Sequence, residues 1–147
     1  LAIGQYDTYT PLQILNYINT IASFGIRYRM SFVKKDAEIL NTVPLDKDSF
    51  ERIKEGFYQV VNGGTANNYV DRKYMAAGKT GTAQSYYSKD ITTINTTFAV
   101  FMPKDDPLYS MVIMNPNISI ENAKIKYNAP LHRLISKEIT NYLFANT

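Results

Sequence analysis

One short stretch, AAGKTGTAQ at residues 76–84, places a lysine and two threonines among residues with almost no bulk. If the stretch is a β-strand, its side chains alternate between two faces, so that Lys79 and Gly81 share one face. Thr80 and Thr82 then share the other face. The ammonium of Lys79 gives a positive field suited to a carboxylate, and threonine hydroxyls can donate hydrogen bonds to the same group. The missing side chain of Gly81 lets another backbone approach the strand.

The backbone of this stretch adds further chemistry if the strand lies at an open sheet edge. The N–H of Thr82 can then point at a ligand oxygen, and its C=O can accept a hydrogen bond from an extended peptide. Such groups suit the binding of a peptide C-terminus and the stabilisation of an oxyanion. A tight turn is the simpler alternative, and a Lys-[Ser/Thr]-Gly-[Ser/Thr] string occurs by chance in roughly one chain per hundred of this length. The surrounding elements therefore have to decide between a strand and a turn.

The composition excludes several classes of site. The chain has 147 residues, enough for one domain with a core of its own. It contains no cysteine, which excludes disulfides, thiolate metal sites and a cysteine nucleophile. His132 is its only histidine, which excludes a histidine-based triad, and we expect neither a metal nor a cofactor. A net charge of +3 without a cluster of basic residues argues against binding to nucleic acid.

Apolar residues at helical spacing predict two helices before the lysine-containing stretch. The first has Thr10 as its N-cap with a proline at the next position, and Gly25 ends it. The second opens with a capping box formed by Asp48 and Glu51 and stops at the NGG sequence of residues 62–64. The apolar face of each helix is expected to pack in the core.

Three strands are predicted next, at residues 76–84, 96–102 and 109–115. The polar residues 85–95 are expected to form an exposed loop or hairpin tip, and PKDDPL is a strong turn signal before the third strand. A last helix opens at residues 128–130 and turns an apolar face to the sheet. That face comprises Leu131, Leu134, Ile135, Ile139, Tyr142 and Leu143. This order predicts an α+β fold with helices packed on an antiparallel sheet of about three strands.

The string GKTGTAQ is similar to the third active-site motif of penicillin-recognising serine transpeptidases and β-lactamases, whose motifs include S-x-x-K and K-T-G. The segment AIGQYDTYTPLQILNYINTIASFGIRY resembles the part between the second and third motifs in class B penicillin-binding proteins. IKEGFYQVVNGGTA resembles the helix and Gly-Thr-Ala turn that follow, and TTFAVFMPKDDPLYSMVIMNPN resembles the next two strands. The resemblance covers essentially the whole chain and is strongest in residues 2–25 and 56–84.

This resemblance implies a role for each matching residue. Lys79 would assist proton movement near the serine of the second motif and attract the substrate carboxylate. Thr80 and Thr82 would contact that carboxylate, which belongs to a stem peptide ending in D-Ala-D-Ala or to a β-lactam antibiotic. The N–H of Thr82 would form half of the oxyanion hole. Gly81 would permit close approach, and Gln84 at the far end of the strand would line the cleft.

The S-x-x-K and S-x-N motifs of the family lie upstream of the position that Gly4 matches. The resemblance therefore implies that residues 1–147 are the C-terminal portion of a single transpeptidase domain, with part of the fold that penicillin-binding proteins share with serine β-lactamases. Acyl transfer needs a nucleophile and its base, and the resemblance places both in the upstream motifs. We therefore expect the chain alone to be inactive. The parent is expected to cross-link peptidoglycan stem peptides through an acyl-serine intermediate. It would act outside the cytoplasmic membrane, held by an upstream anchor.

Other interpretations stay open. A serine β-lactamase or β-lactam-sensor domain shares the K-T-G strand, and a non-catalytic relative can use that strand to capture a peptide. The TPLQ segment and the Gly-Thr-Ala turn favour the transpeptidase. The family sheet has five strands, two of them from near the start of the domain. The strand at residues 109–115 is therefore expected to keep an unpaired edge, through which this piece would associate with itself.

Overall fold

The first helix forms where its cap is predicted. In the computed structural model, which describes residues 7–120 and 131–146, helix α1 spans Pro11–Ala22. Thr10 Oγ1 accepts a hydrogen bond from the N–H of Gln13 at 3.3 Å, and Gln13 Oε1 accepts one from the N–H of Thr10 at 2.8 Å. Gly25 follows with φ +88°, and a Cβ there would lie 2.7 Å from the ring of Phe50. The predicted N-cap is therefore confirmed; at the other end the helix stops at Ala22 with Ser23 as its C-cap, and Gly25 lies in the turn that follows.

Helix α2 spans Lys47–Asn62, and its N-terminal end differs from the prediction. The carboxylate of Asp46 accepts hydrogen bonds from the N–H of Ser49 at 2.8 Å and from its hydroxyl at 2.7 Å. The predicted capping box of Asp48 and Glu51 is wrong, because Asp46 occupies the capping position and Asp48 lies inside the first turn. The C-terminal end of the helix agrees with the prediction.

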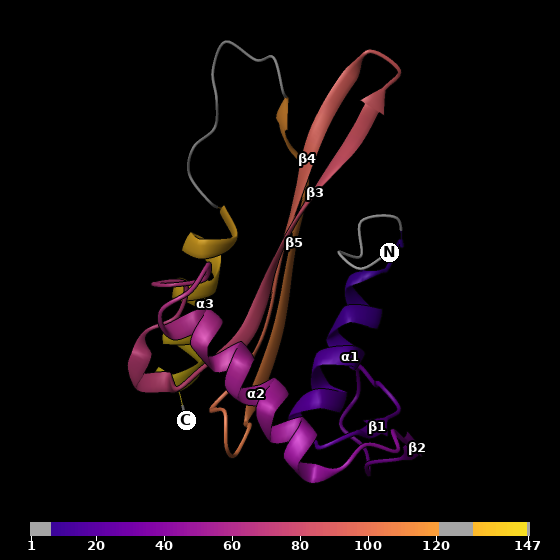
Figure 1. Ribbon diagram of the computed structural model, residues 1–147, viewed down its shortest axis with the longest axis vertical. Coiled ribbons are helices and arrows are strands. Elements are labelled where there is room, and N and C mark those ends of the chain that lie inside the picture. The colour runs from indigo at the N-terminus through magenta and orange to yellow at the C-terminus, as the bar shows by residue number, and fades with distance from the viewer. Residues whose placement is uncertain (1–6, 121–130, 147) are drawn as a thin grey trace.

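The main sheet is an antiparallel meander in the order β3-β4-β5. The strands are β3 (Ala77–Ser88), β4 (Ile91–Met102) and β5 (Tyr109–Ile120). This confirms the α+β fold with a three-stranded antiparallel sheet. Residues 85–95, expected to be a loop or hairpin tip, are mostly strand and form a long hairpin that projects beyond the helices (Figure 1). Their polar side chains leave the backbone free to pair, and threonine and tyrosine favour strands.

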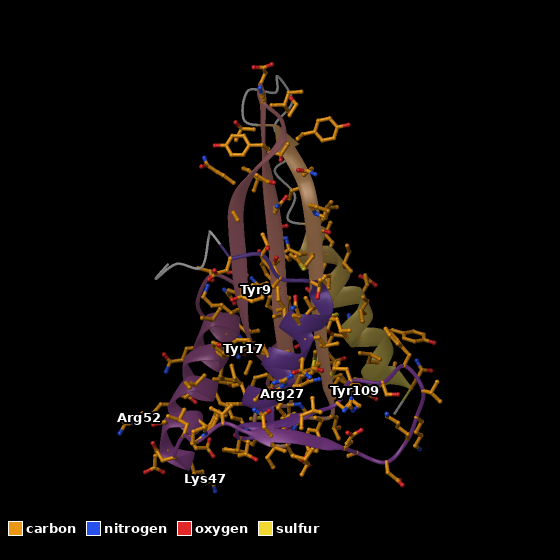
Figure 2. All side chains as sticks on the ribbon, turned by 90° about the vertical axis from the view of Figure 1, so that its right-hand side faces the viewer. Tyr9, Tyr17, Arg27, Lys47, Arg52 and Tyr109 are labelled. Carbon is orange, nitrogen blue, oxygen red and sulfur yellow. The ribbon has the colours of Figure 1, made fainter. Side chains whose placement is uncertain are left out.

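A smaller antiparallel sheet pairs β1 (Ile26–Tyr28) with β2 (Ile39–Thr42) beside α1. An apolar groove lies between α1 and this sheet, and Tyr9, Tyr17 and Arg27 are among the residues that line it (Figure 2). The groove is formed by elements other than β3, so it is separate from the lysine-containing strand. A short 3₁₀ helix at Arg72–Tyr74 leads into β3. Among the described residues, no helix is both long enough and apolar enough to cross a membrane.

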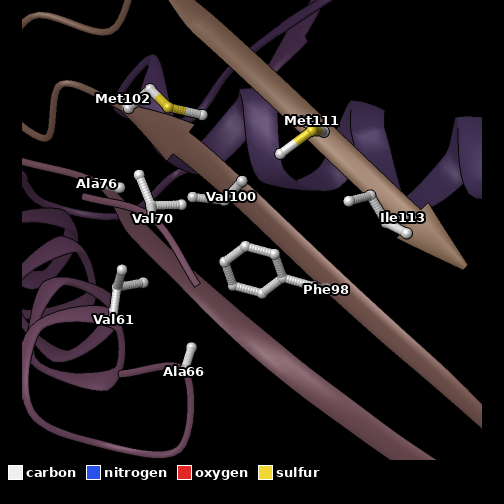
Figure 3. Packing of buried hydrophobic residues seen from close by; sticks show 9 residues of the cluster. All are labelled: Val61, Ala66, Val70, Ala76, Phe98, Val100, Met102, Met111 and Ile113. Carbon is white, nitrogen blue, oxygen red and sulfur yellow. The ribbon is translucent and has the colours of Figure 1, made fainter. Parts of the chain in front are cut away.

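Buried side chains of β4 alternate between the two faces of the sheet, and each face has its own core. Phe98, Val100 and Met102 pack with residues from the end of α2, the loop before β3, and β5 (Figure 3). Ala99 and Phe101 pack with buried residues of α1. Helices α1 and α3 lie on opposite sides of the sheet, and α2 lies along β3 (Figure 1). The sheet is therefore held from both faces, while β3 contacts α2 along part of its length.

Helix α3 spans Leu131–Ala145, and it buries a different face from the one predicted. Its buried residues are His132, Ser136 and Thr140, whereas Leu134 is 55% exposed and Tyr142 is 70% exposed. The polar face is buried because its groups find partners: for example, Ser136 Oγ donates to the C=O of Tyr69 at 2.8 Å. Within the described sheet, no strand lies beyond β5 for the apolar residues to cover. The predicted opening of this helix at residues 128–130 lies outside the described residues.

Candidate active-site strand

The predicted Lys-Thr-Gly-Thr sequence lies on β3, an edge strand of the described three-stranded sheet. Lys79 lies opposite Ala99, whose side chain belongs to the core beside α1. Thr80 lies opposite Phe98, whose side chain belongs to the core on the other face. The next two residues continue the alternation. The prediction of a strand with the lysine and the first threonine on opposite faces is confirmed, and the tight turn is excluded.

Backbone groups of an antiparallel strand point alternately to one neighbour side and the other. The C=O of Ala76 accepts a hydrogen bond from Asn62 Nδ2 at 3.1 Å, and so it points away from β4 toward α2. The C=O of Thr80 likewise points to this outer side, where it accepts a hydrogen bond from Lys79 Nζ at 2.8 Å. By the same alternation, the N–H and C=O of Thr82 point to the outer edge. A ligand along this edge would therefore meet the backbone groups that the sequence indicated.

The ammonium of Lys79 has no acidic partner among the described residues. Its side chain is exposed, and none of the ion pairs in residues 7–120 and 131–146 involves it. The hydrogen bond to the C=O of Thr80 keeps the ammonium close to the strand. A positive charge without a counter-charge, beside an open strand edge, attracts an anionic ligand.

Two glycines of β3 serve different purposes. A Cβ at Gly78 would lie 2.9 Å from Val100 Cα and closer still to the C=O of Ala99, so packing against β4 requires a glycine there. A Cβ at Gly81 would lie 3.7 Å from Thr97 Cβ, which is an ordinary contact. The fold therefore does not require Gly81, and its missing side chain instead leaves that face of the strand open. Sequence reasoning singled out Gly81 and missed Gly78.

Thr80 is half-buried, and its hydroxyl has a partner that the sequence did not indicate. Thr65 Oγ1 lies 2.9 Å from Thr80 Oγ1, within hydrogen-bonding distance. Thr65 belongs to the Gly-Thr-Ala turn after α2, which the resemblance had identified as a turn without giving Thr65 a role. The only available signal was its place in that turn. The two hydroxyls lie side by side because α2 lies along β3.

Thr82 and Gln84 continue the face of Thr80 toward the projecting hairpin. Both are exposed, and they lie opposite Thr96 and Ile94 of β4. The structure thus aligns the predicted carboxylate-binding side chains along one strand over a few residues. In the described parts of the chain, no three histidine or acidic side chains are placed so that they could hold a metal.

One string within the chain itself has the S-x-x-K spacing. Residues 31–34 read SFVK and match that pattern. They follow β1 in an irregular segment in which Phe32 is 98% exposed. Ser31 Oγ donates a hydrogen bond to the C=O of Val33 at 2.8 Å and accepts one from its N–H at 3.3 Å. Because its hydrogen bonds are local, Ser31 is not paired with Lys34 in the way that a nucleophile is paired with its base.

Comparison with known proteins agrees with the fold and identifies the family. The model of the penicillin binding protein transpeptidase domain family matches residues 1–140. Penicillin-binding protein 2A of Bacillus subtilis is 37% identical, and the match covers 78% of this chain and 19% of that protein. Penicillin-binding protein 2B of Streptococcus pneumoniae is 28% identical, and the match covers 79% of this chain and 20% of that protein.

Solved structures show the same fold. Penicillin-binding protein 2B from Streptococcus pneumoniae strain R6 superposes with a TM-score of 0.76 at 24% identity, over 99% of this chain and 26% of that one. The D,D-transpeptidase domain of a peptidoglycan glycosyltransferase from Eggerthella lenta gives a TM-score of 0.62 at 18% identity, over 92% of this chain and 32% of that one. The chain spans about a fifth of the length of the relatives it matches in sequence. It belongs to the penicillin-binding protein transpeptidase family, among the class B members.

Proposed function

We propose that residues 1–147 are the C-terminal portion of the transpeptidase domain of a longer class B penicillin-binding protein. In this proposal, β3 forms the wall of the active site that binds the substrate carboxylate. The observation that carries the proposal is the outer edge of β3. There the ammonium of Lys79 lies close to the strand without an acidic partner among the described residues, and the backbone N–H of Thr82 points outward, with the exposed hydroxyl of Thr82 on the adjoining face. Penicillin, after which the family is named, carries a carboxylate beside its reactive amide, which suits this set of groups.

The substrate we propose is a peptidoglycan stem peptide that ends in D-Ala-D-Ala. Lys79 attracts the terminal carboxylate, and the hydroxyls of Thr80 and Thr82 donate hydrogen bonds to it. The peptide lies along the open edge of β3, with Gly81 leaving room for its backbone and Gln84 lining the cleft further along. The last peptide bond of the substrate then faces the N–H of Thr82. That N–H stabilises the carbonyl oxygen as it gains negative charge, and one such donor typically changes the rate by about 10²- to 10³-fold.

The chemistry needs a serine that we place upstream of this portion. The serine oxygen attacks the carbonyl of the penultimate D-Ala, and its proton passes through a neighbouring base to the nitrogen of the leaving D-Ala. Lys79 assists this proton movement. The resulting acyl-serine is attacked by the amine of a second stem peptide, which forms the cross-link and returns the proton to the serine. A β-lactam reacts at the same position, but its leaving nitrogen stays attached to the acyl group.

Labelling of the full-length protein with a fluorescent penicillin tests the proposal. We expect a stable covalent adduct on a serine upstream of Leu1, and no covalent adduct on residues 1–147 produced alone. An adduct that hydrolyses quickly would favour a β-lactamase. Binding without any adduct would favour a non-catalytic peptide-binding relative. A covalent adduct on the chain alone would contradict the proposed location of the nucleophile.

The location of the parent protein follows from the same proposal. Stem peptides are cross-linked outside the cytoplasmic membrane, so we place the domain on that face, held by an anchor that precedes this portion. Protease added to intact spheroplasts should remove an epitope tag placed after Thr147 while leaving a cytoplasmic marker intact. Protection of the tag until the membrane is broken would contradict this placement.

A further inference from the structure

The hydroxyls of Thr65 and Thr80 lie within hydrogen-bonding distance, and the proposed function decides which of the two donates. Their oxygens lie 2.9 Å apart, and either hydroxyl can be the donor. A hydroxyl has one proton to donate and two lone pairs with which to accept. If Thr80 donates its proton to a substrate carboxylate, it can only accept from Thr65. A hydroxyl that accepts one hydrogen bond becomes a better donor in the next. The bond from Thr65 therefore strengthens the bond that Thr80 donates to the carboxylate.

The backbone around Thr65 is held on both sides. A Cβ on Gly64 would lie 2.9 Å from Val60 Cα, so the turn passes too close to α2 for any other residue at that position. On the other side, the N–H of Ala66 donates to the C=O of Val60 at 3.0 Å, and Ala66 is completely buried. Thr65 therefore projects from a turn that has little freedom to move, which is what a residue that orients another side chain requires.

Hydrogen bonds also fix the end of α2, just before the turn, relative to β3. Asn62 Nδ2 donates to the C=O of Tyr58 at 2.8 Å and to the C=O of Ala76 at 3.1 Å. The end of α2 and the turn after it thus hold β3 at two places: Asn62 bonds to Ala76, the residue before the strand, and Thr65 lies beside Thr80 within it. Two contacts fix the position of the turn along the strand more closely than one.

We infer that Thr65 is a positioning residue for substrate recognition, and this inference rests on the function proposed above. Its hydroxyl donates to Thr80 Oγ1 and directs the proton of Thr80 toward the carboxylate of the stem peptide or the β-lactam. Without Thr65, the hydroxyl of Thr80 rotates freely and spends part of its time donating to other acceptors. The effect is confined to ligands that carry the carboxylate, because Thr80 has no other proposed contact with the ligand.

The test compares acylation rates of the full-length protein by benzylpenicillin and by its methyl ester, which lacks the negative charge. Thr65→Val keeps the shape of the side chain and removes the donor. We expect it to lower the rate with benzylpenicillin by about three- to tenfold, the usual effect of one hydrogen bond, and to change the rate with the ester by less than about twofold. Thr65→Ser keeps the hydroxyl and should restore the rate. Thr42→Val, a threonine on β2 of the small sheet, is the matched control.

A double substitution separates positioning from a separate role in binding. If Thr65 acts through Thr80, then Thr65→Val adds less than twofold to the effect of Thr80→Val with benzylpenicillin. Equal loss of rate with both ligands, fully additive effects, or no loss with Thr65→Val would each overturn the inference. Should Thr65→Val fail to give a wild-type melting temperature, Thr65→Ala is compared with Thr65→Ser in its place. A wild-type protein that benzylpenicillin does not acylate would instead overturn the proposed function, and this inference with it.

Discussion

The side-chain amide of Asn62 donates a hydrogen bond to the C=O of Ala76 at 3.1 Å, which joins the last residue of α2 to the residue that precedes β3. This bond fixes the start of the candidate active-site strand relative to the helix beside it. The same alignment brings Thr65 within hydrogen-bonding distance of Thr80. The geometry of the proposed carboxylate site therefore depends on a residue that would not touch the substrate.

Asn62→Ala should lower the free energy of unfolding by about 1–2 kcal/mol, because it removes two hydrogen bonds and leaves the C=O of Ala76 without its partner. Urea unfolding of the full-length protein measures the change. Asn67→Ala, at an exposed position in the following turn, is the matched control and should change stability by less than about 0.5 kcal/mol. Equal effects of the two substitutions would contradict the role assigned to Asn62.

The two glycines of β3 should respond differently to the same substitution. Gly78→Ala forces a methyl group against the backbone of β4 and should destabilise the fold by about 1–3 kcal/mol. Gly81→Ala meets only ordinary contacts, so the melting temperature should change little while acylation by penicillin slows, because the methyl group occupies space left for the ligand. Thermal unfolding and labelling rates, measured on both variants, check the contrast. Normal acylation in Gly81→Ala would show that the open face is not used.

His132 should make the fold sensitive to acid. It is 6% exposed, its Nε2 lies 2.9 Å from the hydroxyl of Tyr69, and its Nδ1 is buried without a hydrogen-bond partner among the described residues. Burial lowers the pKa of His132 below its ordinary value. Near pH 6.5 the unfolded state therefore binds more protons than the folded state. Stability should be complete above about pH 6.5 and fall as the pH drops below it, by at most about 1.4 kcal/mol per unit.

His132→Phe keeps a buried ring and removes the titrating group. The difference between the unfolding free energies of wild type and variant should be constant above about pH 7 and should change in favour of the variant as the pH falls to 5. Urea unfolding at several pH values measures this difference. A difference that does not change with pH would show that His132 titrates alike in the folded and unfolded states.

Residues 1–147 produced alone should associate with one another. Within the described sheet β5 has a neighbour only on its β4 side, and α3 leaves Leu134, Ile139 and Tyr142 at least 40% exposed. An unpaired strand edge beside an apolar helix face favours pairing with another chain. Light scattering should give a mass above that of one chain, and Leu134→Glu with Ile139→Glu should reduce it. A monomer at micromolar concentration would contradict this prediction.

The strand that carries the site could be predicted because its signal is local. The alternation of Lys79 and Thr80 follows from strand geometry alone, and the cap at Thr10 follows from residue types at adjacent positions. The N-terminal end of α2 was misplaced because Asp46 and Asp48 both suit a cap, and only the reach of the carboxylate to Ser49 decides between them. Where two residues suit the same cap equally well, only the three-dimensional structure shows which of them forms it.

Features that depend on distant parts of the chain could not be predicted in the same way. Thr65 and Thr80 are 15 residues apart, and only the position of α2 along β3 brings their hydroxyls together. The buried face of α3 was predicted from its apolar residues, yet Tyr69 supplies hydrogen bonds that bury His132 and Ser136 instead. The sequence did not indicate that position 78 must be glycine, because a side chain is excluded there only by the backbone of β4.

The central claim is that β3 binds the carboxylate of the ligand that acylates the parent protein. The most direct measurement is the second-order rate of acylation by benzylpenicillin, for the full-length wild type and for Lys79→Ala, with Lys89→Ala at the tip of the hairpin as control. Removing the ammonium should slow acylation at least about 100-fold, since it attracts the carboxylate and assists proton movement, while Lys89→Ala should stay within about twofold of wild type. Equal rates for Lys79→Ala and the wild type would contradict the claim.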